Sequence, residues 1–236
     1  MAKRVYLFNE GNKDDRELLG GKGANLCEMT AMGLPVPFGF VITTATCREY
    51  FQTGNKMPSL LEQEYRVALD MVEKKMGARF GDPENPLLFS VRSGAPVSMP
   101  GMMNTILNLG LNDDIAAGLA AKTNNPRFAY DCYRRFISMF ADVVMGVPGE
   151  KFESEIEKYK AEQGKTLDVE MTAADWQAII AVYKTIVDFP EDPFEQLKMA
   201  VEAVFQSWHT PRALIYREMN NISDTLGTAV SVQAMV

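Results

Sequence analysis

Two short stretches of the chain contain residues that could bind a phosphate group, and the first is "LLGGKGANL", residues 18–26. A glycine-rich turn runs into a predicted helix there. The first N–H groups of a helix and its positive dipole end favour an anion, and Lys22 adds a mobile full charge. The stretch is not a Walker loop, because Gly23 stands where Ser or Thr is required and Arg16 where the first glycine is required. It is not a dinucleotide fingerprint either, because Leu26 replaces the third glycine. A helix-start turn with a surface lysine fits this spacing at least as well as a phosphate site.

The second stretch is "SVRSGAPVSMPGMMNTILNLG", residues 90–110. Arg92 follows an apolar strand predicted at 87–91, so its guanidinium is expected to project from the end of a sheet, where a planar fork can bind a phosphate in two places. The loop beyond it could fold over a ligand and give a base soft apolar contacts, and it includes Gly101, Met102 and Met103. A structural ion pair beneath an ordinary loop is the alternative for Arg92, and the two methionines could equally be core residues.

Other residues that could carry chemistry have structural interpretations. Arg134 and Arg135 lie beside Asp131 on a predicted long helix, where a solvated or salt-bridged face is expected. His209 is the only histidine and has no evident partner, so we expect a structural role. The three cysteines are too few and too far apart for a disulfide framework or a metal site, and we expect Cys27, Cys47 and Cys132 to be small buried hydrophobes.

Composition sets the class of protein. The chain has 236 residues, of which 47% are hydrophobic, enough to bury the core of one large or two smaller domains. Its net charge of -7 argues against a general binder of nucleic acid or of anionic membranes. The chain has neither the apolar core of a signal peptide nor 18 uninterrupted apolar residues, so no membrane span and a cytoplasmic location are expected.

The predicted elements form an α+β unit that a helical segment interrupts. Residues 22–33 are expected to form a helix that Pro35 and Pro37 forbid to continue, and 40–43 a short strand. Ser59 and Glu62 resemble a capping box for a helix that ends at Gly77.

Beyond residue 111 the pattern is almost entirely helical. Asn125 is expected to cap a helix with Pro126 at its first position, and Asp192 with Glu195 to form another capping box. A last strand, 227–236, stops without a turn or polar tail, so we expect a fragment whose final strand is an exposed edge.

Four stretches together resemble one family, and they are "GGKGANLCEM", "SVRSGAPVSMPGMMNTILNLGLND", "NPRFAYDCYRRFISMFADVVMGV" and "GTAVSVQAMV". The resemblance is to the N-terminal nucleotide-binding domain of the pyruvate, phosphate dikinase family, and it covers essentially the whole chain. The long Met- and Gly-containing stretch after Arg92 is typical of the dikinases. Phosphoenolpyruvate synthases and glucan-phosphorylating relatives share only the lysine-glycine and "VRS" elements.

The resemblance implies part of an ATP-grasp fold: a first lobe, residues 1–111 plus 192–236, with a mixed or antiparallel sheet and flanking helices, and an inserted all-helical subdomain, residues 112–191. In this family ATP, phosphate and pyruvate become AMP, diphosphate and phosphoenolpyruvate. The β-phosphate of ATP passes through a histidine on a swivelling domain, and a barrel domain makes phosphoenolpyruvate. His209 does not match that histidine.

The resemblance also assigns roles to residues. Lys22 and Arg92 match the phosphate-binding lysine and arginine, with catalytic and ATP-binding roles, while Gly101, Met102 and Met103 fall in the loop that covers the nucleotide. ATP and Mg²⁺ are the implied cofactors, with metal ligands outside this chain, and the complete protein is expected to be a homodimer. The chain alone is expected to be inactive. A phosphoenolpyruvate synthase, a glucan dikinase and a non-catalytic interaction module that keeps the scaffold remain alternatives.

Overall fold

A computed structural model describes residues 3–236 and divides them into two compact units. The first unit comprises the described residues up to Gly77, together with Phe89–Thr105 and Lys198–Val236. The second, the helical unit, comprises Ala78–Leu88 and Ile106–Leu197. All of the predicted insertion 112–191 lies in the helical unit, and its boundaries as a domain stay a prediction.

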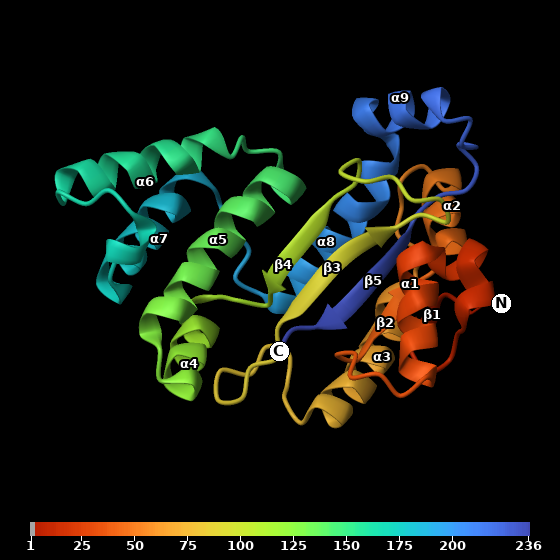
Figure 1. Ribbon diagram of the computed structural model, residues 1–236, viewed down its shortest axis with the longest axis horizontal. Coiled ribbons are helices and arrows are strands. Elements are labelled where there is room, and N and C mark those ends of the chain that lie inside the picture. Colours follow the sequence, from red (N-terminus) through yellow and green to blue (C-terminus); the bar gives the residue numbers. More distant parts are fainter. Residues whose placement is uncertain (1–2) are drawn as a thin grey trace. The chain divides into compact units, whose positions relative to one another are not determined.

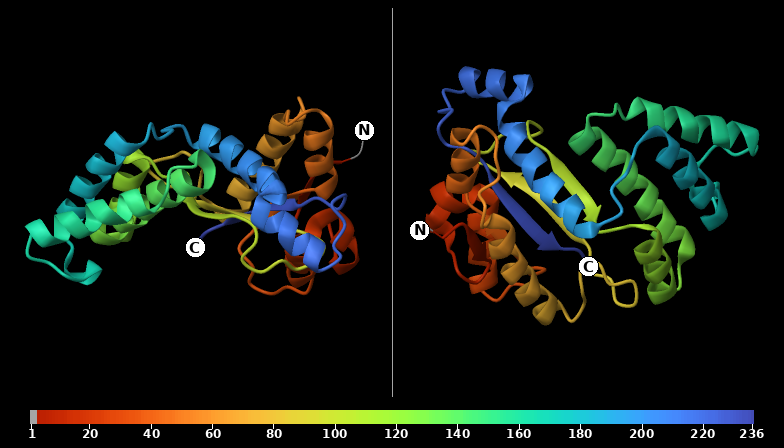
Figure 2. Two further views of the ribbon diagram at one scale, coloured as in Figure 1. Left: turned by 90° about the horizontal axis from the view of Figure 1, so that it is seen from above. Right: turned by 180° about the vertical axis from the view of Figure 1, so that it is seen from behind.

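Four strands form the sheet of the first unit in the order β1-β2-β5-β3, and each neighbouring pair is antiparallel. They are β1 (Val5–Leu7), β2 (Gly39–Ile42), β3 (Phe89–Gly94) and β5 (Ala229–Ala234), and β4 (Thr105–Leu109) follows β3 in the strand order. Figures 1 and 2 show β5, in blue, between its two neighbours. The prediction of an exposed final edge strand is therefore wrong: β5 is buried along its whole length because both of its sides are paired.

Register and packing divide the sheet into two faces. Val41, Ser231 and Arg92 are partners across β2, β5 and β3, so their side chains share one face. The helix α1 (Arg16–Ala31) covers this face, since a Cβ added at Gly23 would lie 2.9 Å from Val41 Cγ2. Alternation places Val5 and Leu7 on the other face, where they line a groove with residues of α3 (Leu61–Met76).

The ends of several elements differ from the prediction. The helix α3 begins after Leu60 without a side-chain cap, so the capping box of Ser59 and Glu62 is wrong; a backbone bond from Leu61 N to Pro58 O closes the first turn instead. Its end is confirmed, because Gly77 adopts the left-handed conformation there. The predicted strand 87–91 is displaced, because pairing with β5 continues through Gly94.

The remaining helices of the first unit lie at the two ends of its sequence. The short η1 (Lys13–Asp15) precedes α1, and α2 (Thr44–Gln52) follows β2 directly. Towards the end of the chain come α8 (Pro193–Gln206), whose first turn belongs to the helical unit, then η3 (Ser207–His209) and α9 (Pro211–Met219). Asp192 Oδ1 accepts a hydrogen bond from Phe194 N at the start of α8.

The helical unit is built from four α-helices and a short 3-10 turn, which Figures 1 and 2 show joined by loops. Asn125 caps α5 with Pro126 at its first position, as predicted. Aromatic side chains including Phe136, Phe140 and Phe189 pack edge to face in its core. The elements are α4 (Asp113–Thr123), α5 (Pro126–Met145), α6 (Glu150–Glu162), η2 (Asp168–Glu170) and α7 (Ala173–Ile186).

Within residues 3–236 the structure has no helix long and apolar enough to cross a membrane.

Candidate functional site: a cationic cavity beside the glycine turn

The glycine turn breaks α1 into two helical pieces. Gly20 has φ +69°, outside the helical region, and a Cβ added there would lie only 1.7 Å from Gly94 O. Only glycine fits, because a left-handed conformation and a close backbone approach coincide. The predicted helix start near Lys22 is confirmed in this sense, since the longer piece of α1 begins after the break and runs to Ala31.

A cavity of about 610 Å³ lies beside this turn, within the first unit. We call it the α1–β3 cavity. Its lining includes two cations and no Asp or Glu. The lining residues are Arg16, Gly21, Lys22 and Asn25 from α1, Ser93 and Gly94 from β3, and Ala95, Val97, Ser98, Met99, Pro100, Gly101, Met103 and Thr105 from the following segment.

Lys22 reaches across the turn to the exit of β3. Its Nζ donates a hydrogen bond of 2.9 Å to Ser93 O, and within residues 3–236 it forms no ion pair. Loss of water around the ammonium and the nearby charge of Arg92 lower the pKa of Lys22. Lys22 and Arg92 repel each other because no carboxylate lies between them, and a bound anion would offset this repulsion.

Arg92 lies inside β3 and not beyond its end, so the expectation that it projects from the sheet is wrong. Its Nη2 donates a hydrogen bond to Gln233 Oε1 on β5, and its buried Nε has no partner among the described residues. Gln233 is held in turn by its Nε2, which donates to Pro37 O at 3.0 Å. Arg92 does not line the α1–β3 cavity, but it lies on the face of the sheet that α1 covers and is close enough to Lys22 to affect its pKa. Ser231 lies on the same face, and its buried Oγ also has no partner among the described residues.

The loop after β3 forms one wall of the cavity. Met102 N donates to Met99 O at 3.2 Å, which closes a turn with Pro100 and Gly101 at its centre, and Gly101 has φ +70°. Met99 is buried and packs with Trp208 and Ala213; Met102 and Met103 pack against the same cluster. Of the predicted loop residues, Gly101 and Met103 line the cavity. Met102 does not line it and packs against the Met99–Trp208 cluster.

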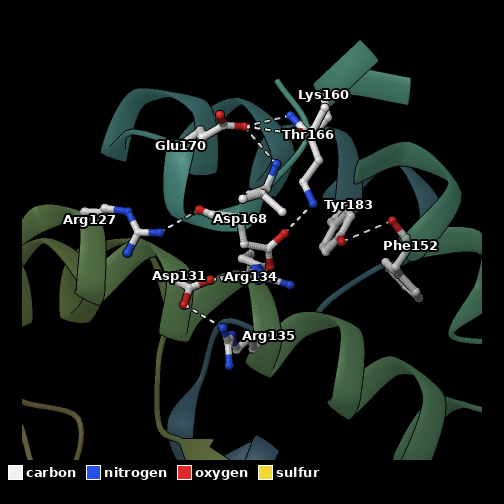
Figure 3. A network of polar contacts seen from close by, with 11 residues as sticks. Arg127, Asp131, Arg134, Arg135, Phe152, Lys160, Thr166, Asp168, Glu170 and Tyr183 are labelled. Carbon is white, nitrogen blue, oxygen red and sulfur yellow. Dashed lines mark hydrogen bonds and ion pairs between the residues drawn. The ribbon is translucent and has the colours of Figure 1, made fainter. Parts of the chain in front are cut away.

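The arginines of α5 take part in a network of ion pairs. Arg134 is buried and contacts Asp131 and Asp168 at 2.8 Å each, while Lys160 also contacts Asp168. Figure 3 shows Asp168 between these two cations. Arg135 is exposed and pairs with Asp131 at 3.0 Å. The predicted salt-bridged face is confirmed, although Arg134 is far less solvated than expected.

The other candidates have structural surroundings. The His209 ring stands edge-on to Phe51 with centroids 4.3 Å apart, and burial followed by the charge of Arg217 lowers the pKa of His209. Cys27 and Cys47 are buried and Cys132 is partly so. Burial raises the pKa of Cys27 and of Cys47 to about 11, which keeps both thiols protonated and unreactive.

A metal site is not formed by these residues. No group of three or more His, Cys, Asp or Glu side chains that could hold a metal ion occurs in the part of the chain that the structure describes. The cavity lining has no carboxylate at all, so it fits the charge of a polyphosphate but not a divalent cation.

Two residues of the site were missed by the sequence interpretation. Arg16 lines the cavity and donates from Nε to Pro96 O at 2.8 Å. In the sequence Arg16 is only a cation four residues before Gly20. Its contact with Pro96, 80 residues away, exists only in the folded chain. Gln233 could not be found at all, because its contact with Arg92 joins residues 141 positions apart.

Comparison with known proteins identifies the family of the chain. Residues 16–70 and 53–236 match the model of the pyruvate phosphate dikinase AMP/ATP-binding domain. The chain is 53% identical over 243 residues to pyruvate, phosphate dikinase of Clostridium symbiosum, with 100% of this chain and 28% of the relative covered. It is 52% identical to the chloroplastic enzymes named pyruvate, phosphate dikinase of Flaveria trinervia and pyruvate, phosphate dikinase 1 of Zea mays, with 99% of this chain and 26% of each relative covered.

The chain thus spans about a quarter of the length of these curated relatives. Because both plant relatives are named chloroplastic, a cytoplasmic location stays a prediction. Because the family model matches nearly the whole chain, the chain belongs to the pyruvate phosphate dikinase AMP/ATP-binding domain family.

Proposed function

We propose that this chain is the ATP-binding part of a pyruvate, phosphate dikinase. The observation that carries the proposal is the α1–β3 cavity, which is lined by Lys22 and Arg16 without any carboxylate and lies at the family's matched segment. A nucleoside triphosphate supplies the negative charge that this cavity lacks. The loop with Gly101 and Met103 would cover the nucleotide and exclude water around the transferred phosphate.

The roles of the two predicted phosphate ligands follow from their positions. Lys22 would leave Ser93 O and turn its ammonium to the phosphates, since a charged partner stabilises it more than a carbonyl. Arg92 keeps one guanidinium edge on Gln233, which leaves Nε as an unused donor on the same face. Both would stabilise charge that moves as the phosphoryl group leaves.

The whole reaction requires parts beyond these residues. In the proposal, ATP, phosphate and pyruvate become AMP, diphosphate and phosphoenolpyruvate through a phosphohistidine on another domain, with pyruvate bound in a barrel domain and the complete protein a homodimer. The fold would be the first lobe of an ATP-grasp domain. Mg²⁺ would be held by residues outside this chain, and the chain alone would not turn over.

Calorimetric titration of ATP into the chain tests the proposal. Lys22→Met should weaken ATP binding by roughly 10- to 100-fold, the range expected for a charged hydrogen bond, and Arg92→Met should weaken it similarly. Arg66→Met is the matched control, because Arg66 is an exposed arginine paired with Glu62 on α3. Equal affinity in the wild type and in both site variants would disprove the assignment.

A further inference from the structure

The loop between β3 and β4, residues 95–104, is held by the molecule at two points. On its first side, Arg16 Nε donates to Pro96 O at 2.8 Å and Gly21 N donates to Ala95 O at 2.9 Å. On its second side, Met99 is buried against Trp208 and Ala213. Only Val97 and Ser98 lie between these two attachments, and both are exposed.

The first attachment depends on a side chain in an unusual place. Arg16 is the first residue of α1, where a cation is opposed by the positive end of the helix dipole. It forms no ion pair within residues 3–236 that would offset this cost. Helix stability therefore gives no reason for an arginine at this position.

The backbone around Arg16 leaves room for its guanidinium. A Cβ added at Gly21 would lie 3.4 Å from Arg16 Nη2 and 3.5 Å from Ala95 O, both ordinary contact distances, so the guanidinium lies directly against the glycine turn. An arginine has five N–H donors, and among the described residues Arg16 uses only Nε, which donates to Pro96 O. The guanidinium lines the α1–β3 cavity together with Lys22.

We propose that Arg16 is a positioning residue for the nucleotide: it ties Pro96 to the glycine turn, keeps residues 97–101 over the cavity, and adds a second positive charge for a polyphosphate. The proposal that nucleotide is the ligand rests on the proposed function. The attachment of the loop does not, because it is a property of the chain without ligand.

Hydrogen exchange of the backbone amides of Gly21 and Met102, which donate to Ala95 O and Met99 O, tests the attachment when measured without ligand. Arg16→Met should speed exchange of these amides about tenfold, because the bond to Pro96 O is lost. Arg16→Lys keeps the charge but not the fork, and should restore the protection only in part. Arg66→Met should leave the loop unchanged, and the melting temperature of each variant shows that the fold is intact.

Titration of the same variants with ATP tests the consequence for binding. Affinity should fall about tenfold in Arg16→Met and less in Arg16→Lys. Unchanged loop exchange in Arg16→Met overturns the inference, and so does a loosened loop with undiminished ATP affinity. If the wild type binds no ATP, the proposed function fails, while the exchange measurement still decides whether Arg16 holds the loop.

Discussion

The α1–β3 cavity and the ion-pair network of the helical unit hold their cations in opposite ways. In the helical unit Arg134 contacts two carboxylates, and Lys160, Lys165 and Lys184 each contact at least one. Around the α1–β3 cavity, the hydrogen bonds of Arg16 and Lys22 within residues 3–236 go to backbone carbonyls, and that of Arg92 goes to an amide oxygen. A cation with a permanent carboxylate stabilises a fold, whereas one held by neutral oxygens is available for a mobile anion.

The way the cavity and the ion-pair network hold their charges also determines which substitutions they tolerate. The cavity depends on backbone geometry, and Gly20→Ala should destabilise the chain by about 4 kcal/mol or more, since the new Cβ would meet Gly94 O at 1.7 Å. Gly33→Ala is the control: its φ is +74° but its surroundings are open, so the cost should be about 1 kcal/mol. Urea unfolding of both variants measures the difference, and equal costs would mean that the close approach at Gly20 relaxes freely.

The paired charges should tolerate substitution less well than the unpaired ones. Arg134→Met should cost about 2 kcal/mol, because it removes a buried cation from Asp131 and Asp168 and from the Trp176 ring, 4.4 Å away. The two carboxylates keep Arg135 and Lys160 as partners. Lys22→Met should change the free energy of unfolding by less than about 1 kcal/mol, since it removes an exposed charge that has no counter-ion. Denaturant titration compares the two, and a larger loss in Lys22→Met than in Arg134→Met would refute the distinction.

Acid should act on the helical unit through its carboxylates. Burial alone would raise the pKa of Asp175, but the hydrogen bonds from Lys165 and Thr172 outweigh it and hold that pKa well below its usual range. A lowered folded pKa gives stability that is complete above about 3.8, the ordinary value, and is lost as the pH falls below it. The indole N–H signal of Trp176, followed by NMR on acidification, should report this loss.

Asp175→Asn is the matched control for this acid sensitivity, because it keeps the shape of the side chain and removes its titration. Its Trp176 signal should depend less on pH below about 4 than that of the wild type. Identical acid profiles in the two proteins would show that Asp175 is not the group that couples acid to the helical unit.

The local parts of the site could be predicted from the sequence, and its distant parts could not. The family resemblance placed Lys22, Gly101 and Met103 at a common site, and they line one cavity. The glycine turn and the Pro-Gly turn that position them are local features of the sequence. The prediction that Arg92 lies beyond the end of its strand was wrong, because pairing with β5 extends β3 to Gly94. The strand Thr105–Leu109 is absent from the predicted elements; Asn108 interrupts its short apolar run and adopts φ +58°.

The central position of β5 has a consequence for the order of synthesis. Residues 39–42 and 89–94 leave the ribosome long before 229–234, yet they are joined only through that last strand. At ordinary translation rates the gap between β3 and β5 lasts on the order of ten seconds. During that time both strands present an unpaired edge facing the space that β5 will fill, so a nascent chain stalled in this interval would be the form most prone to aggregation.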